Sequence, residues 1–402
     1  MTQKARPIRM PRQTASDRPV SGLPATEPRK ANTPRKRKVM EDTAPLISAP
    51  TLPVFDFANR PDYSEFVLAA NTGRRQPLAG FDADYSDIVD YIVRCTHKIW
   101  EEKAVGLIYT HYAHNVLVHY SSGIMYGREA MVTNTLQRIA LYAERRAYAD
   151  DVIWSGNELD GFYSSHRVSS TGTHTGYSEY GPPSGRRIHR WGIADCFIRE
   201  NRIVEEWLAS DTLTEVRQMG FDPVALAKRA ILPNKPHTHG ELDRLPTGQN
   251  YPTFLALPDA TQDPQAFVAA ILHNMWNARL INMVREHYSP GHVAFVPDSR
   301  KLYGHGDYEN FVITLMACFP DLAVNIDHQC VQGDERRGFR VATRCTFQGT
   351  HEGYGPYGAP TGRRIFLIVI SHHVIRGGKI AQEWTIFDEF ALLKQLHGQL
   401  EG

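Results

Sequence analysis

Cysteine is scarce in this chain, and long apolar runs and targeting signals are missing from it. The 402 residues include five cysteines with no C-x-x-C pair among them: Cys95, Cys196, Cys318, Cys330 and Cys345. This odd, scattered set excludes a disulfide framework or a cysteine zinc site and is typical of a reducing compartment. No stretch approaches the ~18 apolar residues of a membrane span, and the N-terminus has no apolar signal segment. We therefore expect a cytoplasmic protein without a membrane partner.

Several catalytic and metal-binding motifs are also missing. The sequence has no P-loop, no G-x-G-x-x-G and no G-x-S-x-G, which disfavours nucleotide-dependent and serine-hydrolase chemistry. Its 18 histidines show no H-E-x-x-H or facial-triad spacing. His372 and His373 are adjacent on a predicted strand, so they face opposite ways and cannot share an ion without distortion. We expect neither a metal site nor a cofactor.

Positive charge is concentrated at the N-terminus. Residues 1–40 carry eleven Lys and Arg against two acids, a net charge of +9, while the other 362 residues carry 34 against 42, a net charge of −8. The segment is rich in Pro, Ser and Thr and poor in aromatics, so we expect residues 1–45 to form a disordered basic tail. A solvated spacer is the simpler role for this tail, and contact of its run Arg35–Lys38 with nucleic acid is the alternative.

An internal repeat organises the rest of the chain. Residues 172–220 align without a gap on residues 349–397, 177 positions further on, and 20 of the 49 aligned residues are identical. At a shift of 176 the alignment extends upstream to His97 and His273. Two copies of this length indicate a duplicated domain rather than a solenoid. We place the two domains at residues 84–222 and 262–400, with a lead-in arm at 46–83 and a linker at 223–261.

Each copy has helical patterns first and strand patterns afterwards. Apolar residues recur at helical spacing from Asp87 to Glu102 and from Pro264 to Leu280. In the first copy we expect further helices at 105–112 and from 127 to about 142, and strands at 116–119, 151–158, 161–171, 187–199 and 202–209. Helices followed by a run of strands indicate an α+β fold.

The predicted strand at Ile365–Ile375 is apolar at almost every position. Strict alternation would leave one face to water, so this strand has to be covered on both faces. The domain's own helices would cover one face, and the sheet of the other copy is the obvious cover for the second. We therefore predict an intramolecular pseudo-dimer packed sheet to sheet. Further association into homo-oligomers stays open.

The residues that carry the repeat also carry a resemblance to a known family. The copies read GTHTGYSEYGPPSGRR and GTHEGYGPYGAPTGRR, and both continue with R-x-x-[RK]-I-x-x-E-W-x-x-x-D. This pattern resembles the SnoaL-like polyketide cyclases of the NTF2-like superfamily. The resemblance implies two tandem cone-shaped α+β domains, each with a curved antiparallel sheet packed on helices around an apolar pocket. It also implies a cofactor-free aldol cyclisation in polyketide metabolism, although the superfamily hosts isomerases, dehydratases and non-catalytic binders too.

The end of the last strand carries the candidate catalytic residues. Trp207 and Asp211, like Trp384 and Asp388 in the second copy, are four positions apart, so on a strand indole and carboxylate can point into one cavity. The resemblance places a catalytic acid/base aspartate at this position, and apolar walls would raise the pKa of its carboxyl. The alternative is that each aspartate caps the following helix by accepting backbone N–H bonds.

Further candidates lie near these strands. His174 and His351, in the two G-T-H motifs, could relay a proton to an enolising carbonyl, and a structural link between strand and turn is the alternative. We expect substrate contacts from Trp207, Trp384, Tyr177, Tyr354 and His119.

Two functions fit these observations. The first is a cofactor-independent enzyme that uses Asp as a general acid/base on a small hydrophobic or aromatic carbonyl compound. The second is a non-catalytic protein that binds a small molecule in the same cones. Substitution of Asp211 or Asp388 by Asn separates them, because only an enzyme would lose turnover while it still binds its ligand.

Overall fold

The computed structural model describes residues 73–232 and 253–400. The predicted basic tail, residues 46–72 of the lead-in and the centre of the predicted linker lie outside the described residues. The described end of the lead-in buries Leu78 and Phe81 in the apolar core of the first of two α+β units.

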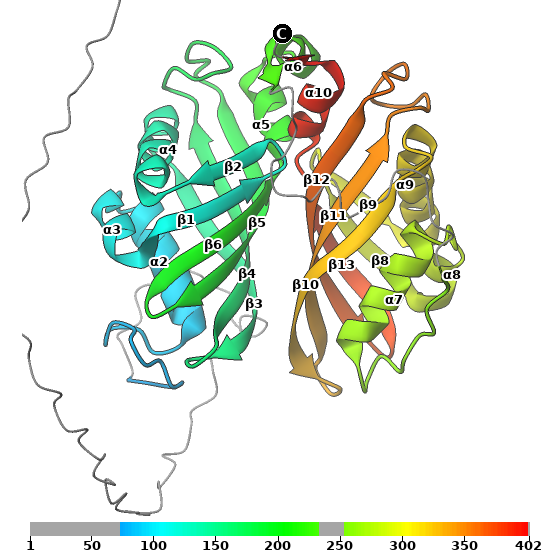
Figure 1. Cartoon of the computed structure of the whole chain (residues 1–402), viewed down its shortest axis with the longest axis horizontal. Coiled ribbons are helices and arrows are strands. Elements are labelled where there is room, and N and C mark those ends of the chain that lie inside the picture. Colours follow the sequence, from blue (N-terminus) through cyan, green and yellow to red (C-terminus); the bar gives the residue numbers. More distant parts are fainter. Residues whose placement is uncertain (1–72, 233–252, 401–402) are drawn as a thin grey trace, which may run out of the picture. The chain divides into compact units, whose positions relative to one another are not determined.

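The first unit is a six-stranded sheet with helices on one face (Figure 1). Its strand order is β2-β1-β6-β5-β4-β3, and all neighbours are antiparallel except the parallel pair β1 and β6. The strands are β1 (Tyr112–Tyr120), β2 (Gly123–Tyr126), β3 (Arg146–Asn157), β4 (Gly161–Thr173), β5 (Arg187–Arg199) and β6 (Arg202–Ser210). The helical segments are α2 (Ile88–Trp100), the 3-10 turn η2 (Val105–Leu107), α3 (Ile108–His111), α4 (Arg128–Leu141), α5 (Thr212–Met219) and α6 (Pro223–Arg229).

The second unit repeats this plan with the order β9-β8-β13-β12-β11-β10 (Figure 1). Its strands are β8 (Tyr288–Val296), β9 (Arg300–Tyr303), β10 (Ala323–Asp334), β11 (Gly338–Thr350), β12 (Arg364–Arg376) and β13 (Lys379–Ile386). Its helices are α7 (Pro264–Trp276), α8 (Met283–His287), α9 (Gly304–Cys318) and α10 (Glu389–His397). A short parallel pair, β7 (Ile231–Leu232) with β14 (Gln399–Leu400), joins the end of one unit to the end of the other.

Equivalent strands and helices of the two units are separated by the same number of residues as the two copies of the sequence repeat. Strands β4 and β11, and likewise β5 and β12, have bounds that differ by 177 residues at both ends, while α2 and α7 differ by 176. The predicted α+β class is therefore confirmed, and the two units are consistent with a tandem duplication.

Local sequence explains where these elements begin and turn. Helix α2 starts after Asp87, whose carboxylate accepts the backbone N–H of Asp90, so the prediction from Asp87 to Glu102 differs from the structure only at the ends. The β5–β6 turn uses Glu200 and Asn201 at positive φ, where the second unit has two glycines. The short edge strands β2 and β9 were not predicted.

The central strands are covered on both faces, as the apolar run in the second copy predicts. On β12, Ile365, Leu367 and Val369 lie in the core of the second unit's own helices. The residues between them, such as Phe366 and Ile368, pack with side chains of the first unit's sheet. Strand β6 lies along β12 and β3 along β10. Side chains at alternate positions of the strand therefore pack either in the unit's own interior or in the interface between the two sheets.

Charged groups are buried in this interface as well. Asp151 on β3 forms an ion pair with Arg340 on β11, and its other oxygen lies 3.6 Å from Nδ1 of His372. Nε2 of His372 is 2.9 Å from the Ser165 hydroxyl. Burial would raise the pKa of Asp151, but the nearby His372 ring and the charge of Arg340 hold it below its ordinary value.

Candidate functional site

The first unit encloses a cavity of about 150 Å³ between its sheet and helices α2 and α4. Apolar side chains form much of its wall, and polar groups enter it at separate places. A concave, mostly apolar cavity with a few converging polar groups is the usual form of a small-molecule site. The lining residues from the two helices include Ile92, Cys95, Thr96, Ile99, Met131, Asn134 and Arg138.

Strand β6 supplies one side of the cavity through alternate residues. Glu206, Leu208 and Ser210 line it. Ala209, between two of them, packs in the apolar cluster that joins the two sheets. Because side chains of a strand alternate between its faces, this register directs Glu206 inward.

Glu206 has the environment of an acid/base group. Its side chain is 6% exposed, and the hydroxyl of Tyr112 donates a hydrogen bond to it over 3.4 Å. Burial raises the pKa of Glu206 to about 7. A carboxyl that titrates near neutral pH populates both protonation states, so it can accept a proton and return it.

His166 on β4 is a second titratable group in the cavity wall. It is buried, and its Nε2 has no hydrogen-bond partner among the described residues. Burial and the neighbouring His372 lower its pKa to about 3, so the ring is neutral at physiological pH. A neutral imidazole offers one donor and one acceptor to a ligand.

Another part of the wall carries a cluster of arginines around one buried glutamate. Glu215 on α5 accepts hydrogen bonds from Arg138 (3.3 Å), Arg190 (3.0 Å) and the Tyr142 hydroxyl (2.6 Å). Burial would raise its pKa, but Arg190 and Arg138 lower it to about 2. The guanidinium of Arg145 lies 4.3 Å from the centre of the Trp100 ring, and its Nε is buried without a hydrogen-bond partner.

The electrostatic environment of Glu206 differs from that of the arginine cluster. The pKa of Glu206 responds to burial and to Tyr112, and the arginines do not contribute to it. The pKa of Tyr120, which lines the cavity, is raised by burial and by Glu206 and lowered by Arg138 and Arg190. Glu206 is therefore electrostatically separate from the arginines, whereas Tyr120 is within the electrostatic range of both.

The equivalent space in the second unit is closed. Its residual cavity has a volume of about 10 Å³. Residues 177 positions after those that line the first cavity are larger or apolar: Tyr308 for Met131, Phe311 for Asn134, Leu315 for Arg138, Leu322 for Arg145, Phe347 for Ser170, Leu367 for Arg190 and Phe387 for Ser210. Leu392 likewise replaces Glu215, the carboxylate that contacts the arginines. Glu383, the counterpart of Glu206, is retained, but it accepts hydrogen bonds from the hydroxyls of Tyr308 and Thr385. The second unit thus keeps a carboxyl at the position of Glu206, but this carboxyl is buried and hydrogen-bonded within the unit.

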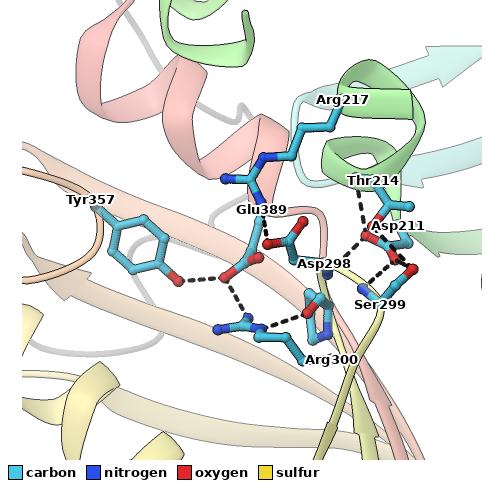
Figure 2. Close-up of polar contacts among 9 residues, drawn as sticks. Asp211, Thr214, Arg217, Asp298, Ser299, Arg300, Tyr357 and Glu389 are labelled. Atoms are coloured by element: carbon cyan, nitrogen blue, oxygen red, sulfur yellow. Dashed lines mark hydrogen bonds and ion pairs between the residues drawn. The ribbon is translucent and has the colours of Figure 1, made fainter. Parts of the chain in front are cut away.

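The predicted catalytic aspartates lie at the start of helices and do not line the first cavity. Figure 2 shows Asp211 capping α5 through the backbone N–H of Thr214 and accepting the backbone N–H groups of Asp298 and Ser299, both at 2.9 Å, from the second unit. Asp388 caps α10 through Ala391 N–H. These are the hydrogen bonds of the capping alternative, and a catalytic role for either residue stays a prediction.

The predicted histidines lie at the turns after β4 and β11. Nδ1 of His174 accepts the backbone N–H of Ser184 over 3.2 Å, and Nδ1 of His351 lies 3.2 Å from the Thr361 hydroxyl. Burial lowers the pKa of both rings. Neither histidine lines the first cavity. The contacts match the alternative in which each histidine links strand to turn.

The predicted aromatic contacts lie on other surfaces. Trp207 faces the second sheet, where Arg344 stands 3.4 Å from its ring centre and His119 stacks on its ring at 5.1 Å. Trp384 is covered reciprocally by Arg167 of the first unit at 4.1 Å. The side chains of Tyr177 and Tyr354 are 82% and 79% exposed, respectively. The structure therefore brings none of these five residues into the first cavity, and substrate contact by them stays a prediction.

The adjacent histidines on β12 face opposite ways. His372 reaches Ser165 of the other sheet, whereas His373 lies 3.6 Å from Glu383 inside its own unit. Among the described residues, no group of three or more His, Cys, Asp or Glu is arranged to hold a metal ion. In the same part of the chain, no helix is long and apolar enough to cross a membrane.

The site residues predicted from the sequence include neither Glu206 nor the arginines. Glu206 and Glu383 stand beside the two tryptophans in the repeated I-x-x-E-W motif, so the signal was present but was assigned to Trp and Asp. The arginine cluster had no comparable signal, because Arg138, Arg145 and Arg190 come from three separate segments.

Comparison with known proteins agrees with this fold. Residues 266–396 match the family model described as SnoaL-like polyketide cyclase, so this part of the chain is a SnoaL-like polyketide cyclase domain. No curated protein matches the chain.

Solved structures also align with one portion of the chain. A candidate SnoaL-like polyketide cyclase from Jannaschia sp. CCS1 is 17% identical over 37% of this chain and 98% of its own, with a TM-score of 0.30. AclR, a candidate hydroxylase from Streptomyces galilaeus, is 23% identical over 34% and 96%, with a TM-score of 0.29. IdmH, a candidate polyketide cyclase from Streptomyces antibioticus, is 26% identical over 32% and 94%, with a TM-score of 0.28. At these scores the three structures carry no argument about the function of this chain.

Proposed function

We propose that this chain is an enzyme that catalyses proton transfer at carbon, by cyclisation or isomerisation, on a small carbonyl compound held in the cavity of the first unit. The observation that carries the proposal is Glu206, a buried carboxyl in an open cavity with a pKa raised to about 7. The SnoaL-like match lies in the second unit, at residues 266–396, and the internal repeat relates the first unit to it, which supports chemistry of this class. No step of this reaction requires a cofactor.

The cavity provides the groups that such a reaction needs. Ionised Glu206 takes a proton from the carbon next to the substrate carbonyl, which leaves an enolate. Tyr120, Ser170 and neutral His166 line the same space, and in this proposal they donate hydrogen bonds to the enolate oxygen. In a cyclisation the enolate carbon attacks a second carbonyl, and protonated Glu206 returns the proton to the new alkoxide. In an isomerisation Glu206 returns the proton to a different carbon.

The second unit has a structural role in this proposal. Its glutamate, Glu383, is surrounded by Tyr308 and Thr385, and the space in front of it is filled. The two glutamates therefore form a matched pair for experiment, one in an open cavity and one in a closed core.

The test compares four proteins incubated with a metabolite extract of the source cells: the wild type, Glu206→Gln, Glu383→Gln and Asp211→Asn. Untargeted mass spectrometry follows consumption of a metabolite, and a thermal melt checks that each variant is folded. We expect the wild type, Glu383→Gln and Asp211→Asn to consume the same compound and Glu206→Gln to lose roughly 100-fold or more in rate. A cyclisation or isomerisation appears as a new retention time without a change in mass.

Two results would contradict the proposal. If folded Glu206→Gln turns over at the wild-type rate while Asp211→Asn does not, the aspartate predicted from the sequence is the acid/base group. If all four proteins retain the same compound without consuming it, the chain is a non-catalytic binding protein.

A further inference from the structure

The walls of the first cavity carry more positive than negative charge. Arg138, Arg145 and Arg190 line it, and Glu215 is the carboxylate that contacts this cluster. Glu206, the acid that lines the cavity, has a pKa near neutral, and the arginines do not contribute to that pKa. Three guanidinium groups against one ionised carboxylate leave a net charge of +2 at this part of the wall.

Glu215 does not use up the hydrogen-bonding capacity of these arginines. It accepts one N–H from Arg138 and one from Arg190, and the Tyr142 hydroxyl takes a further position on it. Each guanidinium carries five donors in a planar fork. The remaining donors of Arg138 and Arg190 are therefore available to another acceptor.

Arg145 is the arginine of the cluster whose charge is least balanced by a carboxylate. No carboxylate of the described residues lies within ion-pair distance of it, its Nε is buried without a partner, and its contact is the face of Trp100. Burial and the charges of Arg190 and Arg138 lower its pKa to about 9. A partly buried cation whose Nε has no hydrogen-bond partner and which has no carboxylate within ion-pair distance would be stabilised by a ligand anion.

We propose that the cavity binds a carboxylate, which the fork of Arg145 holds together with Arg138 and Arg190 while Glu206 faces the reacting end of the same molecule. This inference rests on the proposed function in that it takes the cavity as the substrate site. It names the substrate class as a small carbonyl compound with a free carboxylate. Planar guanidinium groups suit a carboxylate because both oxygens can be bound at once.

The second unit agrees with this assignment. The positions of all three arginines and of Glu215 are occupied there by leucine, in Leu315, Leu322, Leu367 and Leu392. The arginines are therefore not required to build the fold, since the second unit packs without them. They occur in the unit that keeps an open cavity.

The experiment measures the binding of two probes of nearly the same shape, benzoate and benzamide, by isothermal titration calorimetry at low ionic strength without polyvalent anions. The proteins are the full chain and its variants Arg145→Gln, Arg145→Lys and Arg146→Gln. Arg146 is the neighbouring arginine, with an exposed side chain paired to Glu101, and serves as the matched control. A charge-assisted bidentate contact predicts benzoate to bind at least ~10-fold more tightly than benzamide to the wild type.

We expect Arg145→Gln to lose this preference with little change for benzamide, Arg145→Lys to keep part of it, and Arg146→Gln to behave as the wild type. A thermal melt confirms that each variant is folded. Equal affinity of the wild type for both probes would overturn the proposal, as would absence of benzoate binding at ~10 mM. A preference that survives in both Arg145 variants would also overturn the role of that residue. Because binding is measured without turnover, failure here leaves the assignment of Glu206 standing, and loss of that assignment leaves this result intact.

Discussion

Replacing Glu206 by Gln is predicted to change how the stability of the protein depends on pH. Glutamine keeps the shape of the side chain and can accept the hydrogen bond of Tyr112, but it does not titrate. Burial raises the pKa of Glu206 from an ordinary value of 4.5 to about 7, so the folded protein holds this proton more tightly than the unfolded chain. The wild type therefore loses stability as pH rises from about 4.5 and stops losing it above about 7.

The size of the effect follows from the two pKa values. The difference between 4.5 and about 7 corresponds to about 3 kcal/mol of free energy once the group is fully ionised. Some of it has already been lost at about pH 5, so between about pH 5 and pH 8.5 the stability of Glu206→Gln relative to the wild type should grow by ~2–3 kcal/mol. Urea denaturation of both proteins at a series of pH values measures this difference.

The comparison isolates one group because every other titrating residue is present in both proteins. Ser210→Ala, which changes a non-titrating residue of the same cavity, is the control, and its difference from the wild type should not vary over the same pH range. A constant difference between Glu206→Gln and the wild type would show that Glu206 ionises as an ordinary surface carboxyl. The assignment of acid/base chemistry to Glu206 would then have no physical basis.

Four further substitutions test the cavity and the contacts between the two units. Importing the second unit's residues by Ser170→Phe and Ser210→Phe should weaken benzoate binding at least ~10-fold while the thermal melt holds or rises, because the phenyl rings fill the cavity. Asp151→Asn should destabilise the chain by about 3 kcal/mol in chemical denaturation, since it removes the carboxylate of a largely buried ion pair with Arg340. Asp211→Asn should cost about 2 kcal/mol because its amide opposes a backbone N–H, and unchanged turnover of the folded fraction would assign it to structure alone.

Much of the architecture could be predicted because it depends on local pattern and on self-comparison. The strand at Arg187–Arg199 has the predicted bounds, and the apolar run of its counterpart indicated a sheet covered on both faces. Both signals can be read from one continuous segment of the sequence. Packing of one sheet on the other then follows, because an apolar face has to be buried somewhere.

The candidate site was harder to predict because it depends on which face of β6 turns inward. Spacing shows that Trp207 and Asp211 share a face, but it does not say whether that face meets the cavity or the other sheet. Glu205 and Glu206 are adjacent acids on opposite faces, so composition does not reveal which of them is buried. The structure decides in favour of Glu206, and the arginine cluster depends on contacts such as Arg138 with Glu215 that join distant segments.

Joining both units in one chain removes a constraint that symmetry imposes on dimers of identical subunits. In a two-fold dimer every substitution occurs twice, so a phenylalanine that fills one cavity fills both. Here Phe347 closes one interior while Ser170, the residue 177 positions earlier, leaves the other open. Natural selection can therefore improve packing in one half without blocking the half that binds a ligand. Apolar packing in the second unit can therefore offset the stability that the buried polar groups of the first unit cost the chain.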